Sequence, residues 1–272
     1  MILISGCSSG IGKALALALH ARGAAVCATA RRLNTIDDLA QQGLMTLALD
    51  VNDSASIAAA MDTLDARGVH LSMLVNNAGY GLMGPLADIS AANLQQQFQT
   101  NVLGLLALTQ AVIPRLAARR SGLIVNIGSV SGVLTTPFAG AYCATKAAVH
   151  ALSDALRMEL APLGIRVMTV QPGAIASAFG DTASNTVQIS DNSLFAPLAE
   201  AIAKRANASQ QRATPARVFA EQLASAMLAT KPPSLLRIGT GSRALPWVAR
   251  WLPRPLRDGL LSKLFSLSKL KQ

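Results

Sequence analysis

Short apolar runs alternate along the chain with longer stretches of alanine and other helix-forming residues. The runs are uniformly hydrophobic, as is typical of strands that are covered on both faces of a parallel sheet. The expected strands are 1–5, 24–30, 44–49, 71–77, 122–129, 164–172 and one within 231–242, and the expected helices are 11–21, 54–66, 91–119 and 141–161. Because right-handed crossovers return each strand to the same sheet, this order predicts a doubly wound parallel α/β sheet of Rossmann-like type.

Two segments break this pattern and suggest the domain organisation. A chain of 272 residues with this pattern is commonly a single domain, which we place at residues 1–240. Residues 174–212 are mainly small, polar and turn-forming before a short helix, and a long segment of this kind inside a compact domain indicates a lid. Residues 241–272 are expected to form a basic, amphipathic C-terminal extension.

The net charge of +10 is concentrated towards the C-terminus. From Lys231 onward there are nine basic residues and one acidic residue, which gives +8 and leaves the remainder nearly neutral. A nucleic-acid-binding protein needs basic residues on its folded body, so we expect no nucleic-acid partner. The start of the chain lacks the features of an export signal, and we expect a cytoplasmic location. The three cysteines have neither paired nor metal-ligand spacing, so we expect neither disulfides nor a metal site.

A glycine-rich segment lies between the first strand and the first helix. Glycine allows the unusual dihedral angles of a tight turn and lets the backbone approach a pyrophosphate, whose charge is favoured at a helix N-terminus. A plain tight turn would use the same residues. The "VNNAG" sequence at the end of the fourth strand should lie beside the same place. The expected cofactor contacts at this end are Gly6, Ser8, Ser9, Gly10, Ile11, Gly12, Asn77, Ala78 and Gly79.

The end of the second strand indicates which dinucleotide is bound. Ala30 stands where proteins that select the unphosphorylated cofactor carry an acidic residue, and Arg31 and Arg32 follow it. Arginine binds a ribose 2′-phosphate through its forked donors, so we expect NADP(H); the alternative is two solvated arginines. Asp50, with Val51 beside it, could accept a hydrogen bond from the adenine amino group or cap its own loop.

A tyrosine and a lysine lie four residues apart in "YCATK", as Tyr142 and Lys146. With Asn101, Ser129 and the glycine motif in the same order, the chain resembles the short-chain dehydrogenase/reductase family over roughly residues 1–230. The resemblance implies that Tyr142 donates or accepts a proton and that Ser129 holds the substrate oxygen. It also implies that Lys146 binds the nicotinamide ribose and lowers the pKa of the tyrosine, and that Asn101 supports a proton-relay water. The implied nicotinamide loop contains Pro172, Gly173, Ile175 and Ser177, where the family commonly has threonine for the serine.

Electrostatics makes the implied tyrosine role reasonable. Moving the pKa of a tyrosine from about 10 to about 7 needs roughly 4 kcal/mol of preference for the phenolate. A lysine charge at about 4 Å supplies about that much at an effective dielectric of about 20. Residues four apart share a helix face, so Lys146 starts on the correct side of Tyr142.

Several other polar residues are expected to be structural. Ser131 is read as a loop hydroxyl because the family's serine lies thirteen residues before the tyrosine, which selects Ser129. Asn101 could alternatively cap a helix. His20, His70 and His150 are scattered without metal spacing and are expected to be ordinary surface or core residues.

The expected lining of the substrate pocket is mainly apolar and predicts a hydrophobic ketone, aldehyde or alcohol as substrate. The chain is most similar to the branch of 17β-hydroxysteroid dehydrogenases, retinol dehydrogenases and acyl-dihydroxyacetone phosphate reductases. The rival hypothesis is a non-catalytic regulator on the same fold that senses NADP(H). The expected lining residues are Tyr80, Leu82, Met83, Val130, Val133, Leu134, Phe138 and Phe179.

The C-terminal extension has an amphipathic pattern. Leu256, Leu260, Leu264 and Leu267 would form one helical stripe and Asp258, Ser262, Ser266 and Lys269 another. With Trp247 and Trp251 upstream, residues 245–272 could touch an anionic membrane surface. The alternative is a helix over the substrate mouth or at a subunit interface. The resemblance also implies a homodimer or homotetramer that pairs through the helices at about 91–119 and 141–161.

Overall fold

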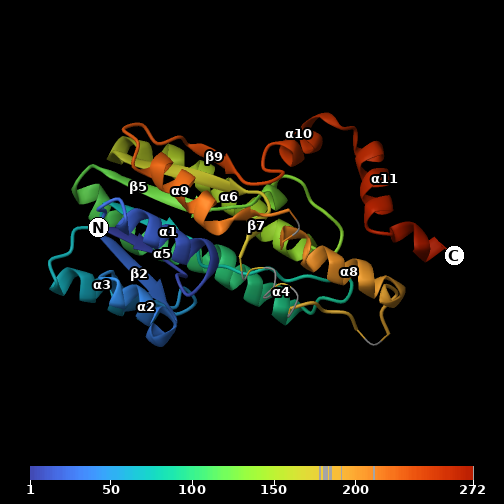
Figure 1. The fold of residues 1–272 in the computed structure, drawn as a ribbon, viewed down its shortest axis with the longest axis horizontal. Helices are drawn as coiled ribbons and strands as arrows, with labels where there is room; N and C mark the ends of the chain where they lie inside the picture. The colour runs from blue at the N-terminus through green and yellow to red at the C-terminus, as the bar shows by residue number, and fades with distance from the viewer. Residues whose placement is uncertain (178, 180–182, 184–185, 191, 211, 272) are drawn as a thin grey trace.

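The computed structural model describes residues 1–177, 179, 183, 186–190, 192–210 and 212–271. Seven strands form one parallel sheet in the order β3-β2-β1-β4-β5-β6-β9. The reversal of strand order between β1 and β4 is the mark of a doubly wound sheet, so the predicted fold is confirmed (Figure 1). The strands are β1 Ile2–Ile4, β2 Val26–Ala30, β3 Met45–Ala48, β4 Met73–Asn76, β5 Gly122–Ile127, β6 Ile165–Pro172 and β9 Leu235–Ile238.

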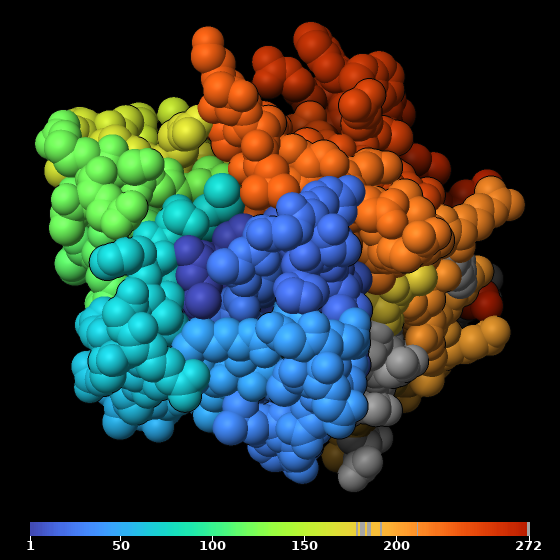
Figure 2. Space-filling view, turned by 60° about the vertical axis from the view of Figure 1, so that its left-hand side comes forward, coloured from blue at the N-terminus to red at the C-terminus, as the bar shows by residue number. Residues whose placement is uncertain are grey.

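Helices cover both faces of the sheet and bury its apolar side chains. Helices α1 (Gly10–His20) and α9 (Ala216–Met227) pack on one face through Leu15, Leu19, Phe219 and Leu223. Figure 2 shows these two helices, distant in the sequence, side by side on the surface. Helices α3 (Ser54–Ala66), α5 (Gly104–Ala118) and α6 (Gly140–Leu160) cover the other face. The central strands are therefore buried on both sides, which explains their uniformly apolar sequences.

The segment predicted as one helix at 91–119 is divided by a change of helical pitch. Helix α4 (Ala91–Phe98) continues through a π-helical turn, Gln99–Leu103, into α5. The window Ala91–Ala118 is the one helix of the described chain that is long and apolar enough to cross a membrane. Its buried residues include Leu108 and Leu116, which pack against the sheet, so the helix is part of the core of the domain.

The predicted lid leaves the sheet after β6. Strand β7 (Ile175–Ala176) pairs with β8 (Thr214–Pro215), and helix α8 (Ala199–Ala206) lies between them in the sequence. Part of the 174–212 segment lies outside the described residues. Within the described part, Phe179 packs against Tyr142 with 5.3 Å between ring centroids, and Leu198 and Ile202 pack with Phe138. The segment therefore covers the beginning of α6.

The C-terminal extension forms α10 (Ala244–Trp251) and α11 (Arg254–Leu264), at the far end of the molecule from the N-terminus (Figure 1). The predicted four-leucine stripe is wrong at its last member. Helix α11 ends at Leu264, and Ser266 adopts the left-handed conformation with φ of 59°, so Leu267 turns towards the body. Leu256, Leu260 and Leu264 remain exposed on the helix. The extension continues after α11 into a 3-10 turn at Leu267–Lys271, while the short helix α2 (Asp37–Gln41) lies between β2 and β3 in the N-terminal half.

Candidate active site

A cavity of about 820 Å³ opens at the carboxyl ends of the parallel strands. Its walls include the residues that directly follow β1, β2, β3, β4, β5 and β6. A doubly wound sheet binds its ligands at this edge, and the volume is in the range of small-molecule sites. Of the predicted site residues, the cavity is lined by Gly6, Ser8, Ser9, Gly10, Ile11, Arg31, Arg32, Asp50, Val51, Asn77, Ala78, Gly79, Ser129, Tyr142, Lys146, Pro172, Gly173, Ile175 and Ser177.

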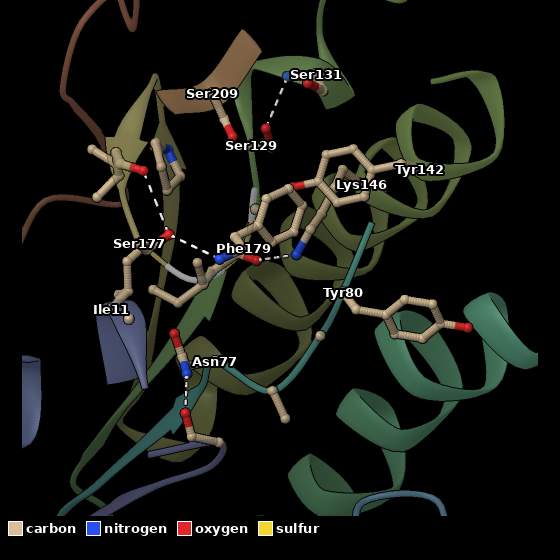
Figure 3. A pocket seen from close by; sticks show the side chains of 18 of the residues that line it. Ile11, Asn77, Tyr80, Ser129, Ser131, Tyr142, Lys146, Ser177, Phe179 and Ser209 are labelled. Atoms are coloured by element: carbon tan, nitrogen blue, oxygen red, sulfur yellow. Dashed lines mark hydrogen bonds between the residues drawn. The ribbon is translucent and has the colours of Figure 1, made fainter. Parts of the chain in front are cut away.

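The glycine-rich turn has the shape of a phosphate cradle. Gly6 and Gly10 have φ of 73° and 59°, in the left-handed region that favours glycine. Asn77 holds the turn, because its Nδ2 donates to the carbonyls of Ser5 and Gly6 at 2.9 Å each (Figure 3). The N-terminus of α1 opens onto this turn, which suits the pyrophosphate of a dinucleotide.

Gly12 is not among the residues that line the cavity, and its expected cofactor contact stays a prediction. A Cβ at this position would lie 2.3 Å from the carbonyl oxygen of Gly6 and 2.4 Å from Nδ2 of Asn77. Glycine is therefore needed here so that α1 can pack tightly against the turn. Gly12 would therefore affect a bound phosphate indirectly, through the packing of α1 against the turn.

The nicotinamide loop closes over the same turn. A Cβ on Gly10 would lie 3.2 Å from Cβ of Ser177, and the Ser177 hydroxyl donates to the carbonyl of Ile175 at 3.4 Å. The backbone N–H of Ser177 donates to Oε1 of Gln210 at 3.2 Å, which ties the loop to the end of the predicted lid. The residues expected to contact the phosphates and the nicotinamide are thus adjacent.

The residues expected at the adenosine end occupy one side of the cavity. Ala30 ends β2, and Arg31 and Arg32 follow it as exposed side chains that line the opening. Asp50 caps its own loop, since its Oδ1 accepts from the backbone N–H of Asn52 at 2.9 Å. It also lines the cavity, so the loop-capping role and an adenine contact are compatible.

Tyr142 and Lys146 lie on the first two turns of α6 and are almost completely buried, at 8% and 6% exposure. Nζ of Lys146 is 5.8 Å from the centroid of the Tyr142 ring and donates to the carbonyl of Ile127 at 2.7 Å (Figure 3). The helix therefore places the ammonium beneath the phenol, as the spacing of four predicts.

The pKa of Tyr142 differs from the sequence-based expectation. Burial raises this pKa to about 12, while a hydrogen bond with the Ser129 hydroxyl and the charge of Arg205 act in the opposite direction. Burial also lowers the pKa of Lys146 to about 8. The pKa of Tyr142 is thus raised and not lowered, because a buried phenolate loses its hydration; the Lys146 ammonium is bonded to the carbonyl of Ile127.

Ser129 lies next to the tyrosine on the loop that follows β5. Its Oγ accepts from the backbone N–H of Ser131 at 3.0 Å, and its own N–H donates to Nε2 of His150 at 3.4 Å. A Cβ on Gly128 would lie 2.4 Å from His150 Nε2, so the histidine packs directly under this loop. Burial, followed by the charge of Lys146, lowers the pKa of His150 to about 4. His150 thus supports the serine as a neutral acceptor.

Asn101 lies behind the cavity wall in the π-helical turn, and its expected support of a proton-relay water stays a prediction. Its Oδ1 accepts from the N–H of Tyr80 at 3.0 Å, and its Nδ2 donates to the Tyr80 carbonyl at 2.9 Å and to Oγ1 of Thr145 at 3.1 Å. These bonds occupy the amide and join the loop after β4 to α6. The side chain therefore acts as a positioning group.

Comparison with known proteins identifies the family. The model of the short chain dehydrogenase family matches residues 1–188. The chain belongs to the short-chain dehydrogenase/reductase family. It is 37% identical to a short-chain dehydrogenase of Penicillium ochrochloron over 98% of both chains. It is 35% identical to an NADPH-dependent 1-acyldihydroxyacetone phosphate reductase of Schizosaccharomyces pombe, over 76% of this chain and 71% of the relative.

A solved structure agrees over nearly the whole chain. A short-chain dehydrogenase from Streptomyces avermitilis superposes with a TM-score of 0.81 at 31% identity, covering 99% of this chain and 97% of that one. Members of the family are oxidoreductases that use a nicotinamide cofactor. The glycine cradle and the buried Tyr142 and Lys146 of this short-chain dehydrogenase/reductase fit such a cofactor.

Part of the expected apolar lining of this short-chain dehydrogenase/reductase is in the cavity. Tyr80, Met83, Val130, Leu134 and Phe179 line it, as predicted. Leu82 is buried elsewhere, and Val133 and Phe138 line a neighbouring cavity of about 540 Å³. The segment from Val133 to Phe138 borders both cavities: Leu134 and Thr136 line the main one, whereas Val133 and Phe138 line the one beside α11.

Several further lining residues come from the C-terminal extension, from α8 and from the loop before α6, and none was named from the sequence as part of the site. Leu261, Leu264 and Phe265 of the C-terminal extension line the main cavity, together with Arg205 of α8 and Thr136. Leu261 and Thr136 also line the neighbouring cavity, so the two spaces share a wall. No motif marks these residues: Arg205 lies in "AKRANAS", which is typical of a solvated helix.

Proposed function

We propose that the protein is an NADP(H)-dependent oxidoreductase that interconverts a hydrophobic ketone or aldehyde and its alcohol. The observation that carries the proposal is the position of Tyr142, Ser129 and Lys146 in the same cavity as the glycine cradle. A phosphate site alone would suit many nucleotide-binding proteins. A buried phenol beside a serine hydroxyl adds the groups that hold a carbonyl oxygen and transfer a proton.

Ser129, Tyr142 and Lys146 would each have a separate role in the proposed reaction. The Ser129 hydroxyl would donate a hydrogen bond to the substrate oxygen, and the Tyr142 phenol, protonated at neutral pH, would give it a proton during reduction. Lys146, whose pKa burial lowers to about 8, keeps its charge below that pH and would stabilise the phenolate that remains. A bound nicotinamide would supply or accept the hydride. The raised pKa keeps the Tyr142 phenol in the protonated form that reduction would need at neutral pH.

The preference for NADP(H) is supported by the end of β2. Arg31 and Arg32 line the cavity beside Ala30, and an acidic residue that would repel a 2′-phosphate is missing from that position. The relative from Schizosaccharomyces pombe is named as NADPH-dependent. The rival function, a regulator that senses NADP(H) without turnover, has no use for the buried Tyr142, Ser129 and Lys146.

The test is NADPH oxidation with a panel of long acyl ketones, steroids, retinoids and small aromatic carbonyls, with NADH in parallel. Turnover of any member with NADPH preferred supports the proposal. NADPH binding without turnover across the panel would favour the regulator.

We also propose that the protein works as a homodimer or homotetramer at a membrane surface. Trp247, Trp251, Leu256 and Leu260 are 56–63% exposed on α10 and α11, in the part of the chain that carries most of the positive charge. An exposed apolar face among basic residues suits anionic lipid headgroups. Leu261 and Phe265 of the same segment line the cavity, so the extension would serve both the substrate mouth and the membrane.

A further inference from the structure

Arg205 is a buried cation that the proposed reaction does not use. It lies on α8, is 9% exposed and lines the main cavity. Its Nε donates to Oγ1 of Thr136 at 2.8 Å. Within the described residues this is the only hydrogen bond of the side chain, and none of the ion pairs includes it. The two terminal amino groups of the guanidinium therefore have no protein acceptor there.

A charge in this environment is unfavourable unless something compensates it. Burying a guanidinium removes its hydration, and proteins normally supply a carboxylate partner or several acceptors. A neutral hydroxyl such as that of Thr136 offsets little of this cost. A guanidinium also remains protonated and presents a planar fork, which binds a carboxylate or a phosphate through two parallel hydrogen bonds. Since the described residues include no such partner, an anionic ligand in the cavity is the group best suited to the free donors.

Arg205 lies apart from the residues expected to bind the cofactor phosphates, so the anion that it would bind is a different group. The cofactor cradle is formed by Gly6, Gly10 and the N-terminus of α1. Arg205 instead acts electrostatically on Tyr142 and Cys143 and is bonded to Thr136, which borders both cavities. The cation thus belongs to the substrate side of the tyrosine.

We propose that Arg205 binds an anionic group of the substrate, so that the substrate is an amphiphile with a carbonyl or alcohol, an apolar chain and a phosphate or carboxylate. Leu261 and Phe265, and the neighbouring cavity lined by Phe138 and Leu267, provide apolar space for the chain. The proposal rests on the proposed oxidoreductase function for the reaction, and on Arg205 for the anion.

Binding of simple amphiphiles tests the anion site without turnover. The full-length protein, saturated with NADP⁺ so that the cofactor phosphate site is filled, is titrated by calorimetry with n-octyl phosphate, n-octanoate and n-octanol. We expect an octyl anion to bind more tightly than octanol, and Arg205→Gln to weaken its binding roughly 10- to 100-fold with little effect on octanol. The two anions distinguish a phosphate site from a carboxylate site. Lys204→Gln, which removes an exposed charge from the same helix, should change none of these affinities.

Two outcomes would overturn the inference. One is equal binding of octanol and both anions by the unmodified protein; the other is a folded Arg205→Gln protein, verified by thermal melting, that binds the anion as tightly as before. If Arg205→Gln does not fold, Arg205→Lys is used, which retains the charge but loses the planar fork of donors. This variant must still weaken binding of the octyl anion more than binding of octanol.

A matched pair of ketones separates this inference from the proposed function. With 1-acyldihydroxyacetone phosphate and its dephosphorylated form, Arg205→Gln should lower kcat/KM roughly 10- to 100-fold for the phosphate compound only. An equal loss for both ketones would mean that Arg205 only tunes Tyr142, and would overturn the anion site. Absence of turnover for every carbonyl, with Arg205-dependent binding of octyl phosphate intact, would contradict the oxidoreductase function and leave the anion site standing.

Discussion

Tyr142 and Lys146 lie about one turn apart on α6, and burial shifts their pKa values in opposite directions. The Tyr142 phenol avoids becoming an anion because burial raises its pKa to about 12, and the Lys146 ammonium loses its proton more easily because burial lowers its pKa to about 8. Each group therefore favours its neutral form, and each would stabilise the charged form of the other. The Tyr142 phenol is therefore protonated at neutral pH and, in the proposed reaction, would give this proton to the substrate oxygen.

Removing the phenol hydroxyl tests this role. Tyr142→Phe should lower turnover by at least about 10²-fold because the proton donor is lost, while the Kd for NADPH stays within roughly threefold. Steady-state rates and NADPH fluorescence titration give the two values. Tyr80→Phe, which removes the other phenol of the chain, is the matched control and should cost less than about tenfold. Retained turnover in Tyr142→Phe would refute the assignment.

The two arginines after β2 carry the second residue-level prediction. Ala30→Asp combined with Arg31→Gln replaces a 2′-phosphate site with an acceptor for a ribose hydroxyl. The ratio of kcat/KM for NADPH to that for NADH should fall roughly 10- to 100-fold, with Arg31→Gln alone giving part of the change. An unchanged ratio in the double variant would place the 2′-phosphate elsewhere.

At the scale of elements, one helix supports the loop that carries the serine. His150 of α6 accepts a hydrogen bond from the N–H of Ser129 and fills the space beside Gly128 and Gly132. A protonated imidazole could not accept that bond. The sequence offers no signal for this contact, because a lone histidine on a helix gives no indication of what packs above it.

The pH dependence of stability follows from this histidine. Its pKa is about 4 in the folded protein and 6.5 in a model peptide, so the unfolded chain takes up a proton first as the pH falls. Stability is complete above pH 6.5 and is lost progressively as the pH falls towards 4, with about 2 kcal/mol of the loss between pH 7 and pH 5. Urea unfolding of the unmodified protein and of His150→Gln should differ by that amount in their pH dependence. His70→Gln, at an exposed site, should behave like the unmodified protein.

The strands and most of the helices could be predicted because burial on both faces leaves a simple apolar pattern. The family motifs also placed Ser129, Tyr142 and Lys146 in the cavity. Contacts that depend on tertiary packing could not be predicted. Gly12 packs against another backbone segment, Asn101 uses its whole amide on Tyr80 and Thr145, and Leu267 follows a left-handed residue. None of these relations is encoded in local spacing.

At the scale of the whole molecule, the C-terminal extension lies between the cavity and the surroundings. Its inner side lines the substrate space with Leu261 and Phe265, and its outer side exposes Trp251, Leu256 and Leu260. Exposed tryptophans and leucines next to arginines are typical of interfacial membrane contacts. A substrate with an apolar chain and an anionic group would itself partition to such a surface.

Substitutions on the outer face alone test the membrane contact. Trp251→Ser, Leu256→Ser and Leu260→Ser combined should reduce sedimentation with anionic liposomes at least about tenfold, because they remove the apolar area that enters the lipid. High salt should weaken binding of the unmodified protein by screening its basic residues. Leu194→Ser, at a leucine that is 82% exposed on the body, is the control. If the unmodified protein does not sediment with the liposomes, the membrane proposal fails.

The origin of the cavity wall has an evolutionary consequence. The residues proposed to transfer the proton and the glycine-rich turn lie within residues 1–188, which the family model matches, whereas Arg205, Leu261 and Phe265 follow that region. Selection can therefore alter what the protein accepts by changing the last third of the chain, while the chemical machinery is inherited intact. Exchanging that third between relatives should transfer substrate specificity and leave the type of reaction unchanged.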